Sequence, residues 1–209
     1  MTTPIKVLLL EDHHVTLNGL RYGLAEEHDI EIVATAMNSD EGFAMAQKFK
    51  PDVILLDLHL PGSLGPKSMV EKFCALTECK VIIFSSEKRV AFVETILELG
   101  VAAYLLKSET SARVAEAIRQ TAGLGGDSSM IVSTELGEAK VILTRTEQDL
   151  VRMLAHGMKY QEISERRFTV PSTVRKQCDL LVEKLNLANR EELIAWAVDN
   201  GYGSLETVS

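Results

Sequence analysis

Residues 53–61 read VILLDLHLP, and this stretch decides the fold. Its first four residues are all apolar and lack the alternation of a half-exposed strand, which predicts a strand buried on both faces, as in a parallel sheet. Asp57 follows at the point where this strand leaves the core. Ligand sites of open parallel sheets lie at the carboxyl ends of the strands. Asp57 is therefore the first candidate for a functional residue, and its partly desolvated carboxylate needs a partner.

The residues around this stretch predict a doubly wound α/β domain. Apolar strand signals alternate with helical spacing of apolar residues throughout residues 1–125. Ser39 is the expected N-cap of the second helix, and Gly100 is expected just beyond the fourth. Right-handed connections leave a parallel five-stranded sheet as nearly the only compact arrangement. The expected strands are 5–10, 31–35, 53–56, 81–84 and 102–106, and the expected helices are 13–27, 39–49, 67–76, 89–99 and 112–122.

Polar side chains follow four of these strands. Glu11 and Asp12 end the first strand, Asp57 the third, Ser85 the fourth and Lys107 the fifth. Three carboxylates at one edge of a sheet cannot all stay ionised without a cation, and oxygen ligands suit Mg²⁺. A metal ion beside a lysine forms a pocket for a phosphoryl group, and one carboxylate can act as the nucleophile that becomes an acyl phosphate. The Ser85 hydroxyl is expected to hydrogen-bond a phosphoryl oxygen.

Taken together, these residues make residues 1–125 resemble the receiver domain of response regulators, a CheY-like fold with strand order 2-1-3-4-5. The resemblance rests on the acidic pair, on Asp57 in a D-x-x-L-P frame with Gly65 beyond it, on Ser85, and on the run YLLK from Tyr104 to Lys107. It implies that Asp57 is the phosphoacceptor, that Lys107 pairs with the phosphoryl group and that Ser85 and Tyr104 form a switch pair. It also implies a set of Mg²⁺ ligands, namely Glu11 through water, Asp12, Asp57 and the backbone carbonyl of His59.

Composition narrows the class of protein further. The 209-residue chain is 46% hydrophobic and 25% charged, as is ordinary for a globular protein. The chain shows no signal-peptide pattern, no membrane-spanning run of ~20 apolar residues, and three cysteines without a metal-type motif, so a cytoplasmic location is expected. His13 and His14 are expected at the surface beside the acidic pair, because neighbouring residues of a helix point in different directions. The Gly- and Ser-containing residues 126–142 predict a linker in which Ile131 and Val132 pack locally.

Residues 143–209 predict a small all-α domain of four short helices. Thr144 and Glu147 fit a capping box at the start of the first helix, and Pro171 fits the first position of the third. A short turn before the third helix predicts a helix-turn-helix unit. The domain resembles the LuxR-type DNA-binding domain, so the whole chain resembles a NarL/FixJ-type response regulator. The resemblance places the third helix in the major groove, with these candidate DNA contacts: Lys159, Arg166, Thr173, Arg175, Lys176, Gln177 and Lys184.

This second domain departs from its family at several positions. Arg167 stands where the family usually has a buried leucine, Gln177 replaces a histidine, and Asp179 places a negative charge on the recognition helix. Residues 143–209 carry 9 Lys and Arg against 10 Asp and Glu, a low balance for a protein that must neutralise several phosphates. The predicted DNA affinity is therefore weak or dependent on dimerisation.

The favoured interpretation is a two-component transcriptional regulator that is not an enzyme beyond the chemistry of its own Asp57. A histidine kinase or a small phosphodonor is expected to phosphorylate Asp57, and a homodimer is expected to bind double-stranded DNA. Two alternatives stay open: a signalling receiver whose helix-turn-helix binds another protein, and a phosphatase that uses the carboxylate cluster on an external substrate. The second is disfavoured because Asp57-Leu58-His59 lacks a second acid two residues beyond the first.

Overall fold

The computed structural model describes residues 3–123, 131–132 and 143–203. These residues divide into two compact units, with residues 88–94 grouped with the second unit and the rest of residues 3–132 forming the first. The predicted boundaries at 125 and 143 are not tested by this division and stay predictions. Among the described residues, no helix combines the length and the apolar character that crossing a bilayer requires.

The first unit contains a parallel sheet with the strand order β2-β1-β3-β4-β5-β6. Its first five strands have the predicted order 2-1-3-4-5, so the predicted fold class is confirmed. β3 pairs with β1 on one side and with β4 on the other, which places Leu56 next to Leu10 and Ile83. The strands are β1 (Ile5–Leu10), β2 (Ile30–Ala36), β3 (Val53–Leu56), β4 (Lys80–Ser85), β5 (Ala103–Leu106) and β6 (Ile131–Val132).

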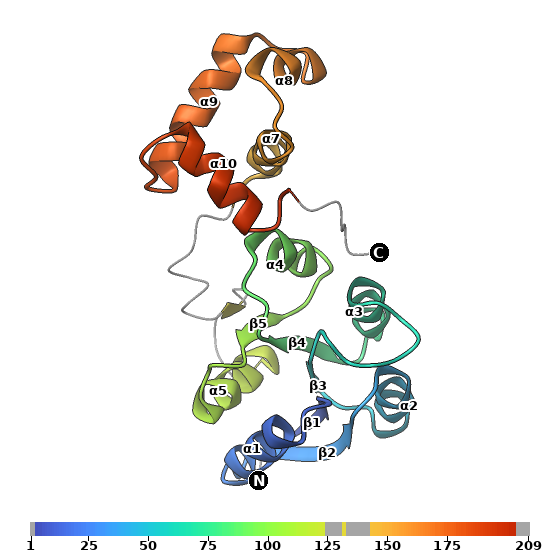
Figure 1. Ribbon diagram of the computed structural model, residues 1–209. Helices are drawn as coiled ribbons and strands as arrows, with labels where there is room; N and C mark the ends of the chain where they lie inside the picture. Colours follow the sequence, from blue (N-terminus) through green and yellow to red (C-terminus); the bar gives the residue numbers. More distant parts are fainter. Residues whose placement is uncertain (1–2, 124–130, 133–142, 204–209) are drawn as a thin grey trace. The chain divides into compact units, whose positions relative to one another are not determined.

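Helices cover both faces of this sheet (Figure 1), which explains why β3 has no polar face. α1 and α5 pack on one face, where Leu24 and Val114 are fully buried against Val7 and Leu55. α2 and α3 lie on the opposite side of the sheet. The helices of the first unit's chain segment are α1 (His14–Ala25), α2 (Ser39–Phe49), α3 (Pro66–Cys74), α4 (Val90–Leu97) and α5 (Ser111–Thr121).

Two details differ from the sequence prediction. Asn38, not Ser39, is the N-cap of α2: its backbone is extended and its Oδ1 accepts a hydrogen bond from the Glu41 N–H at 2.8 Å. Ser39 is the first helical residue instead. The segment expected to pack locally within the linker supplies β6, in which Ile131 and Val132 pair with Ala103 and Tyr104 of β5. The other linker residues between 124 and 142 lie outside the described residues.

Residues 143–203 contain four helices, as predicted: α7 (Arg145–Ala155), α8 (Tyr160–Arg166), α9 (Pro171–Lys184) and α10 (Arg190–Asp199). The Thr144–Glu147 capping box is present and Pro171 opens α9. Residues at helical spacing on each helix meet in one apolar core. This core includes Leu150, Leu154, Ile163, Val174, Cys178, Leu181, Leu193 and Tyr202.

Candidate functional site

Asp57 lies directly beyond β3, and its side chain is 1% exposed. Its backbone N–H donates to the Leu10 carbonyl at 2.9 Å, which extends the pairing of β3 with β1 by one residue. Its Oδ1 accepts a hydrogen bond from the His59 N–H at 3.2 Å. The carboxylate is therefore oriented by the backbone of the loop that follows it. The structure describes this N–H contact of His59, and the role of the His59 carbonyl as a metal ligand stays a prediction.

Lys107 joins the carboxylates at this edge of the sheet. Its Nζ donates to Asp57 Oδ2 at 2.8 Å and to Glu11 Oε1 at 2.9 Å. Burial opposes the charged ammonium group, but the bonds to Asp57 and Glu11 outweigh it, so the pKa of Lys107 lies above its ordinary value. Lys107 is thus held as a cation between two carboxylates that are each 1% exposed. A cation fixed in this way is available to a phosphoryl group on Asp57 without reorganisation.

The acidic pair and His13 complete this edge. Ligand atoms of Glu11, Asp12, His13 and Asp57 all lie within 4.8 Å of one another. Glu11 Oε2 and Asp12 Oδ1 are buried and accept no hydrogen bond from the described residues, although each has a cationic or imidazole nitrogen within 2.8 Å. Buried carboxylate oxygens with open acceptor positions fit a hard divalent cation such as Mg²⁺.

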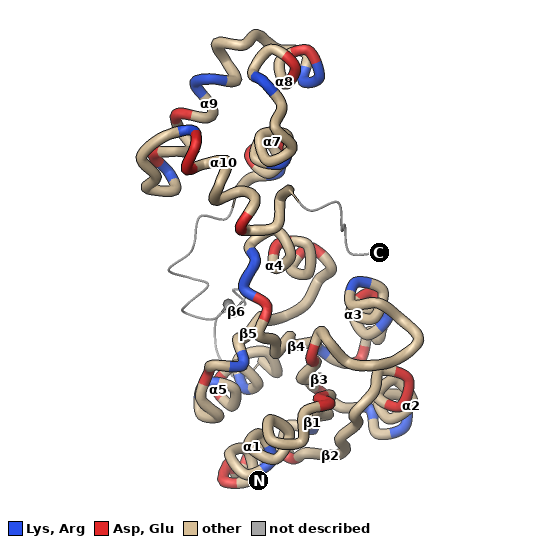
Figure 2. Tube along the Cα trace, viewed as in Figure 1, with Lys and Arg blue, Asp and Glu red and all other residues tan. Residues whose placement is uncertain are grey.

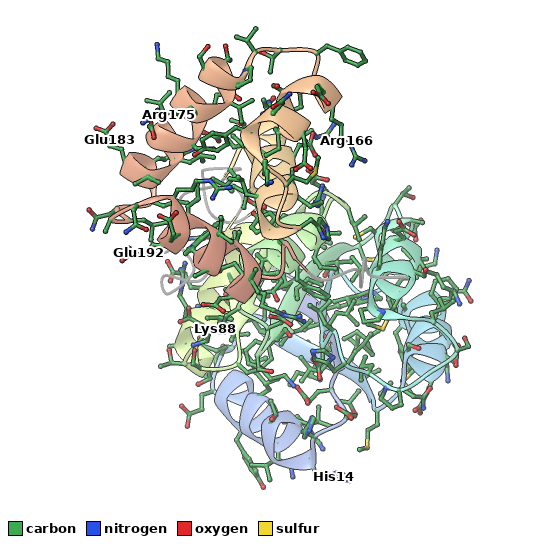
Figure 3. The ribbon with its side chains drawn as sticks, turned by 45° about the horizontal axis from the view of Figure 1, so that its top comes forward. His14, Lys88, Arg166, Arg175, Glu183 and Glu192 are labelled. Atoms are coloured by element: carbon green, nitrogen blue, oxygen red, sulfur yellow. The ribbon has the colours of Figure 1, made fainter. Side chains whose placement is uncertain are left out.

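His13 contacts this cluster more closely than the sequence indicated. Its Nδ1 lies 2.8 Å from Asp12 Oδ1 and 3.1 Å from Glu11 Oε1, and its N–H donates to Glu11 Oε1. Two-thirds of its side chain is nevertheless exposed, while His14 is fully at the surface (Figure 3). The signal in the sequence was the position of His13 directly after the acidic pair, which places it at the N-cap of α1.

Ser85 and Tyr104 lie on neighbouring strands beside this edge. Both are 0% exposed, and the register pairs Ser85 with Leu106 of β5. The Tyr104 hydroxyl donates to the Glu87 carbonyl at 3.0 Å, and the Glu87 N–H donates to Ser85 Oγ at 3.2 Å. Burial is the main reason that the pKa of Tyr104 lies well above its ordinary value, so the hydroxyl stays protonated. In this structure the tyrosine ring is enclosed by the protein.

The second unit presents α9 beyond a short turn from α8, as a helix-turn-helix does. Val174, Cys178 and Leu181 face the core, so the opposite side of α9 is exposed. Thr173, Arg175 and Lys176 are exposed on that helix, while Lys159 and Arg166 are exposed at the two ends of α8. In Figure 3, Arg175 and Glu183 extend away from α9. These five predicted DNA contacts are therefore accessible within this unit.

The other two predicted DNA contacts have partners within the protein. Gln177 is half-buried, and its Oε1 accepts a hydrogen bond from Arg167 Nη1 at 2.9 Å. Lys184 Nζ lies 2.8 Å from Glu147 Oε2 of the capping box. The Arg167–Gln177 contact explains how arginine is accommodated at this position: it joins the end of α8 to the middle of α9. Sequence reasoning missed this contact because the two residues meet only once the turn is built.

Residues of both charges lie along α9 (Figure 2). Arg175 and Lys176 lie in its first half, and Asp179 and Glu183 in its second half. The turn before it carries Phe168, which is 98% exposed and has a φ of +51°, a value that side chains other than glycine and asparagine rarely adopt. An apolar residue kept in such a conformation in solvent contributes nothing to the core. This turn is the part of the unit for which the sequence offered no functional prediction.

Comparison with known proteins identifies a family for each part of the chain. The response regulator receiver domain family matches residues 7–119, more than half of the chain, and the LuxR family of bacterial regulatory proteins matches residues 141–197. The transcriptional regulatory protein LiaR of Bacillus subtilis is 29% identical over 206 residues, which cover 94% of this chain and 98% of LiaR. The nitrate/nitrite response regulator NarL of Escherichia coli K12 is 26% identical and covers 92% of this chain and 94% of its own.

Solved structures agree on the fold. The two-component response regulator RcsB in its DNA complex has a TM-score of 0.61 and 19% identity, and the match covers 95% of this chain and 100% of that one. The response regulator ChrA of a heme-sensing two-component system has a TM-score of 0.53 and 22% identity. The chain therefore belongs to the two-component response regulators of the NarL, LiaR and DesR kind, transcriptional regulators rather than enzymes, in which a receiver domain precedes a LuxR-type DNA-binding domain.

Proposed function

We propose that Asp57 accepts a phosphoryl group and that this modification controls DNA binding by residues 143–209. The observation that carries the proposal is the geometry of one carboxylate: Asp57 is 1% exposed, its Oδ2 is bound by Lys107 at 2.8 Å, and its Oδ1 is bound by the His59 N–H at 3.2 Å. A buried carboxylate held by a cation and a backbone donor is preorganised for nucleophilic attack. The donor is a histidine kinase or a small acyl phosphate.

In the proposed reaction, an Asp57 oxygen attacks the phosphorus atom of the donor. The new bond joins this oxygen to phosphorus, while the bond from phosphorus to the imidazole nitrogen of the kinase, or to the acetyl oxygen of acetyl phosphate, breaks. Lys107 stays protonated, as its raised pKa indicates, and stabilises the negative charge of the transferred group. Glu11, Asp12, Asp57 and the His59 carbonyl would hold Mg²⁺, which supplies further charge neutralisation when bound.

Ser85 and Tyr104 are proposed to report the modification. Both lie at the same end of the sheet as Asp57, and they share Glu87 as a hydrogen-bond partner. A phosphoryl oxygen on Asp57 would accept a hydrogen bond from the Ser85 hydroxyl and draw this side chain toward the phosphoryl group, away from the Glu87 N–H that now donates to its Oγ. That movement would shift the population between two arrangements of the residues after β4.

The proposed output is a homodimer on double-stranded DNA, with α9 in the major groove. The proposed contacts are Lys159, Thr173, Arg175, Lys176, Gln177 and Lys184, with Arg166 on the phosphates. Lys159, Thr173, Arg175 and Lys176 are exposed, which supports them as contacts. To contact DNA, Gln177 would have to leave or share its partner Arg167, and Lys184 its partner Glu147. We place the protein in the cytoplasm, as its three cysteines without a disulfide favour.

Intact-mass spectrometry after treatment with acetyl phosphate and Mg²⁺ tests the chemistry. One phosphoryl group is expected on the native chain, none on Asp57→Asn, and none when EDTA replaces Mg²⁺. The Asp52→Asn variant is the matched control, because Asp52 is an exposed carboxylate one residue before the same strand. A native chain that gains no phosphoryl group under these conditions would refute the proposed phosphorylation.

One observation keeps the protein-interaction alternative worth testing: the exposed Phe168 and Val170 form an apolar turn beside α9. Gel shifts with genomic fragments, with and without acetyl phosphate, separate the two possibilities. A retarded band that strengthens after phosphorylation is expected. Folded protein that retards no fragment in either state would favour a protein partner.

A further inference from the structure

The loop after Asp57, residues 57–65, is attached to the start of α2 at several points. The Ser39 N–H donates to the Pro61 carbonyl at 2.9 Å. The Ser63 N–H donates to Asp40 Oδ2 at 3.0 Å, and the Ser63 hydroxyl donates to Asp40 Oδ1 at 2.6 Å. Asp40 therefore uses both carboxylate oxygens to hold one residue of the loop, a two-bond contact that is more directional than a single hydrogen bond.

Close packing accompanies these bonds. Gly62 lies so near Ser39 that a Cβ atom at Gly62 would come within 1.8 Å of the Ser39 hydroxyl oxygen. Ser39 is 4% exposed, and its Oγ has no hydrogen-bond partner among the described residues. The loop backbone thus lies directly on the first turn of α2. The pKa of Asp40 is lowered, first by the Ser63 hydroxyl and then by the Ser63 N–H, which agrees with a carboxylate that accepts both bonds.

The same loop contains the group that orients Asp57. His59 lies between Asp57 and the attached residues 61–63, and its N–H is the donor to Asp57 Oδ1. β3 fixes the start of the loop through the Asp57 N–H, which is bound to Leu10. Position 59 is therefore held from both sides, by the sheet before it and by α2 after it. If the bonds from Ser63 to Asp40 are lost, the only hydrogen bond among the described residues that still joins the loop to α2 is that from the Ser39 N–H to the Pro61 carbonyl, so the loop and the donor to Asp57 are held less tightly.

We propose that Asp40 is a positioning residue for the phosphoacceptor: through Ser63 it holds the loop whose His59 N–H orients the Asp57 carboxylate. This inference rests on the proposed phosphorylation of Asp57. Asp40 touches neither Asp57 nor the donor, so it acts on the rate of phosphorylation only through the loop. A displaced nucleophile reacts more slowly because reacting groups must meet in a narrow range of geometry.

The exposed position of Asp40 makes the inference testable without unfolding the protein. Hydrogen bonds between exposed groups contribute little to global stability, so Asp40→Ala is expected to fold normally. Its phosphorylation by acetyl phosphate in Mg²⁺, followed by intact mass over time, is expected to slow by about tenfold. Asp40→Asn keeps one acceptor oxygen and is expected to recover part of the rate. Glu41→Ala, which removes an equal charge from the same turn but no loop contact, is expected to match the native chain.

A second measurement reports the loop itself. Amide hydrogen exchange, measured without Mg²⁺ or phosphodonor, is expected to quicken about tenfold or more at Ser63 and His59 in Asp40→Ala and to stay unchanged in Glu41→Ala. Ser63→Ala is expected to have an intermediate rate of phosphorylation, and the double variant with Asp40→Ala is expected to be no slower than Asp40→Ala alone, because both changes break one contact.

The outcomes separate the inference from the function on which it rests. A native chain that is never phosphorylated would overturn the proposed function. A native chain that is phosphorylated, beside an Asp40→Ala variant with fast exchange at Ser63 and an unchanged rate, would overturn the positioning role. Unchanged exchange at Ser63 in that variant would overturn it as well, because the loop would then be held by other groups.

Discussion

The receiver site and the recognition helix both depend on charged side chains, but they hold them in opposite ways. At the receiver site, Glu11 and Asp57 are each 1% exposed and share the ammonium group of Lys107. On α9, Arg175 and Asp179 are exposed, and neither forms an ion pair or hydrogen bond with the described residues. The first set is held by partners within the protein before any ligand arrives, whereas the second is exposed and available to an external partner.

This difference separates chemistry from recognition. A reacting carboxylate gains from preorganised partners, because the reaction then needs no further rearrangement of charge. A surface that meets DNA gains from unpaired cations, because they are free to exchange counterions for phosphates. Buried charges are therefore expected to affect stability strongly, and exposed charges are expected to affect binding.

The strongest way to test the contrast is to remove the central cation of the receiver site. Lys107→Met leaves Glu11 and Asp57 facing each other without a cation, and loss of one partner of a buried ion pair costs about 3–5 kcal/mol. The free energy of unfolding is expected to fall by that amount in urea titrations followed by far-UV circular dichroism. Mg²⁺ is expected to restore part of the loss. The fluorescence of Trp196, the single tryptophan, reports the second unit alone and serves as the internal control.

If the free energy of unfolding falls by less than about 1 kcal/mol, Lys107 contributes no more than a surface lysine, and the contrast between the receiver site and α9 does not hold. The direction in which the stabilisation by Lys107 changes with pH also follows, because the pKa of Lys107 in the folded protein is raised. A group of this kind contributes its full stabilisation below the unfolded pKa, and the contribution is lost as pH rises through the folded pKa. The difference between the native chain and Lys107→Met should therefore shrink in strongly alkaline solution, where Lys107 loses its charge.

The recognition helix offers the second test, through two exposed charges of opposite sign one turn apart. Arg175→Ala is expected to weaken binding to a DNA fragment selected by the native protein by about 1–3 kcal/mol, with no change in the unfolding midpoint. Asp179→Ala is the matched variant: it removes a charge of the same magnitude and opposite sign from the same helix. It is expected to strengthen binding at low salt, because it removes repulsion from the phosphates. Fluorescence anisotropy across a salt series measures both.

Equal affinities for the native chain and both variants would mean that α9 does not lie on DNA. Opposite shifts that vanish at high salt would mean that both residues act on phosphates alone. An Arg175→Ala loss that persists at high salt would indicate contact with a base edge.

The parts of this molecule that could be predicted from sequence share one physical cause. The run at residues 53–56 predicted β3 because burial on both faces leaves no polar position. The sequence predicted that Asp57 and Lys107 lie close together, because the carboxyl ends of parallel strands meet at one edge of the sheet. Such predictions depend on the spacing of apolar residues and on the topology of the sheet, and a few unusual residues do not change either of them.

The parts that escaped prediction depend on local geometry or on distant contacts. Asparagine and serine are both residue types that favour the N-cap position, so the sequence alone does not decide between Asn38 and Ser39. The extended backbone of Asn38 in the structure identifies it as the N-cap. The Arg167–Gln177 bond spans ten residues across a turn, and the bonds from Ser63 to Asp40 span 23. Neither pair follows a helical or strand period, so no pattern in the sequence marks it.

The smallest expected effect refines the comparison, because Lys184 matches Lys107 in distance and differs in burial. Lys184 Nζ lies 2.8 Å from Glu147 Oε2, but the two side chains are 35% and 27% exposed. Lys184→Met is therefore expected to cost about 0–1 kcal/mol in urea titrations followed by Trp196 fluorescence.

Burial opposes ionisation of Glu147, yet hydrogen bonds from Lys184 and Thr144 outweigh it, so the pKa of Glu147 lies below its ordinary value. A carboxylate of this kind stabilises the fold above its unfolded pKa and loses that contribution as pH falls through its folded pKa. The small cost of Lys184→Met should accordingly be present at neutral pH and vanish in acid, whereas the cost of Lys107→Met should be several times larger at neutral pH. Equal costs for the two lysines would show that burial does not distinguish them.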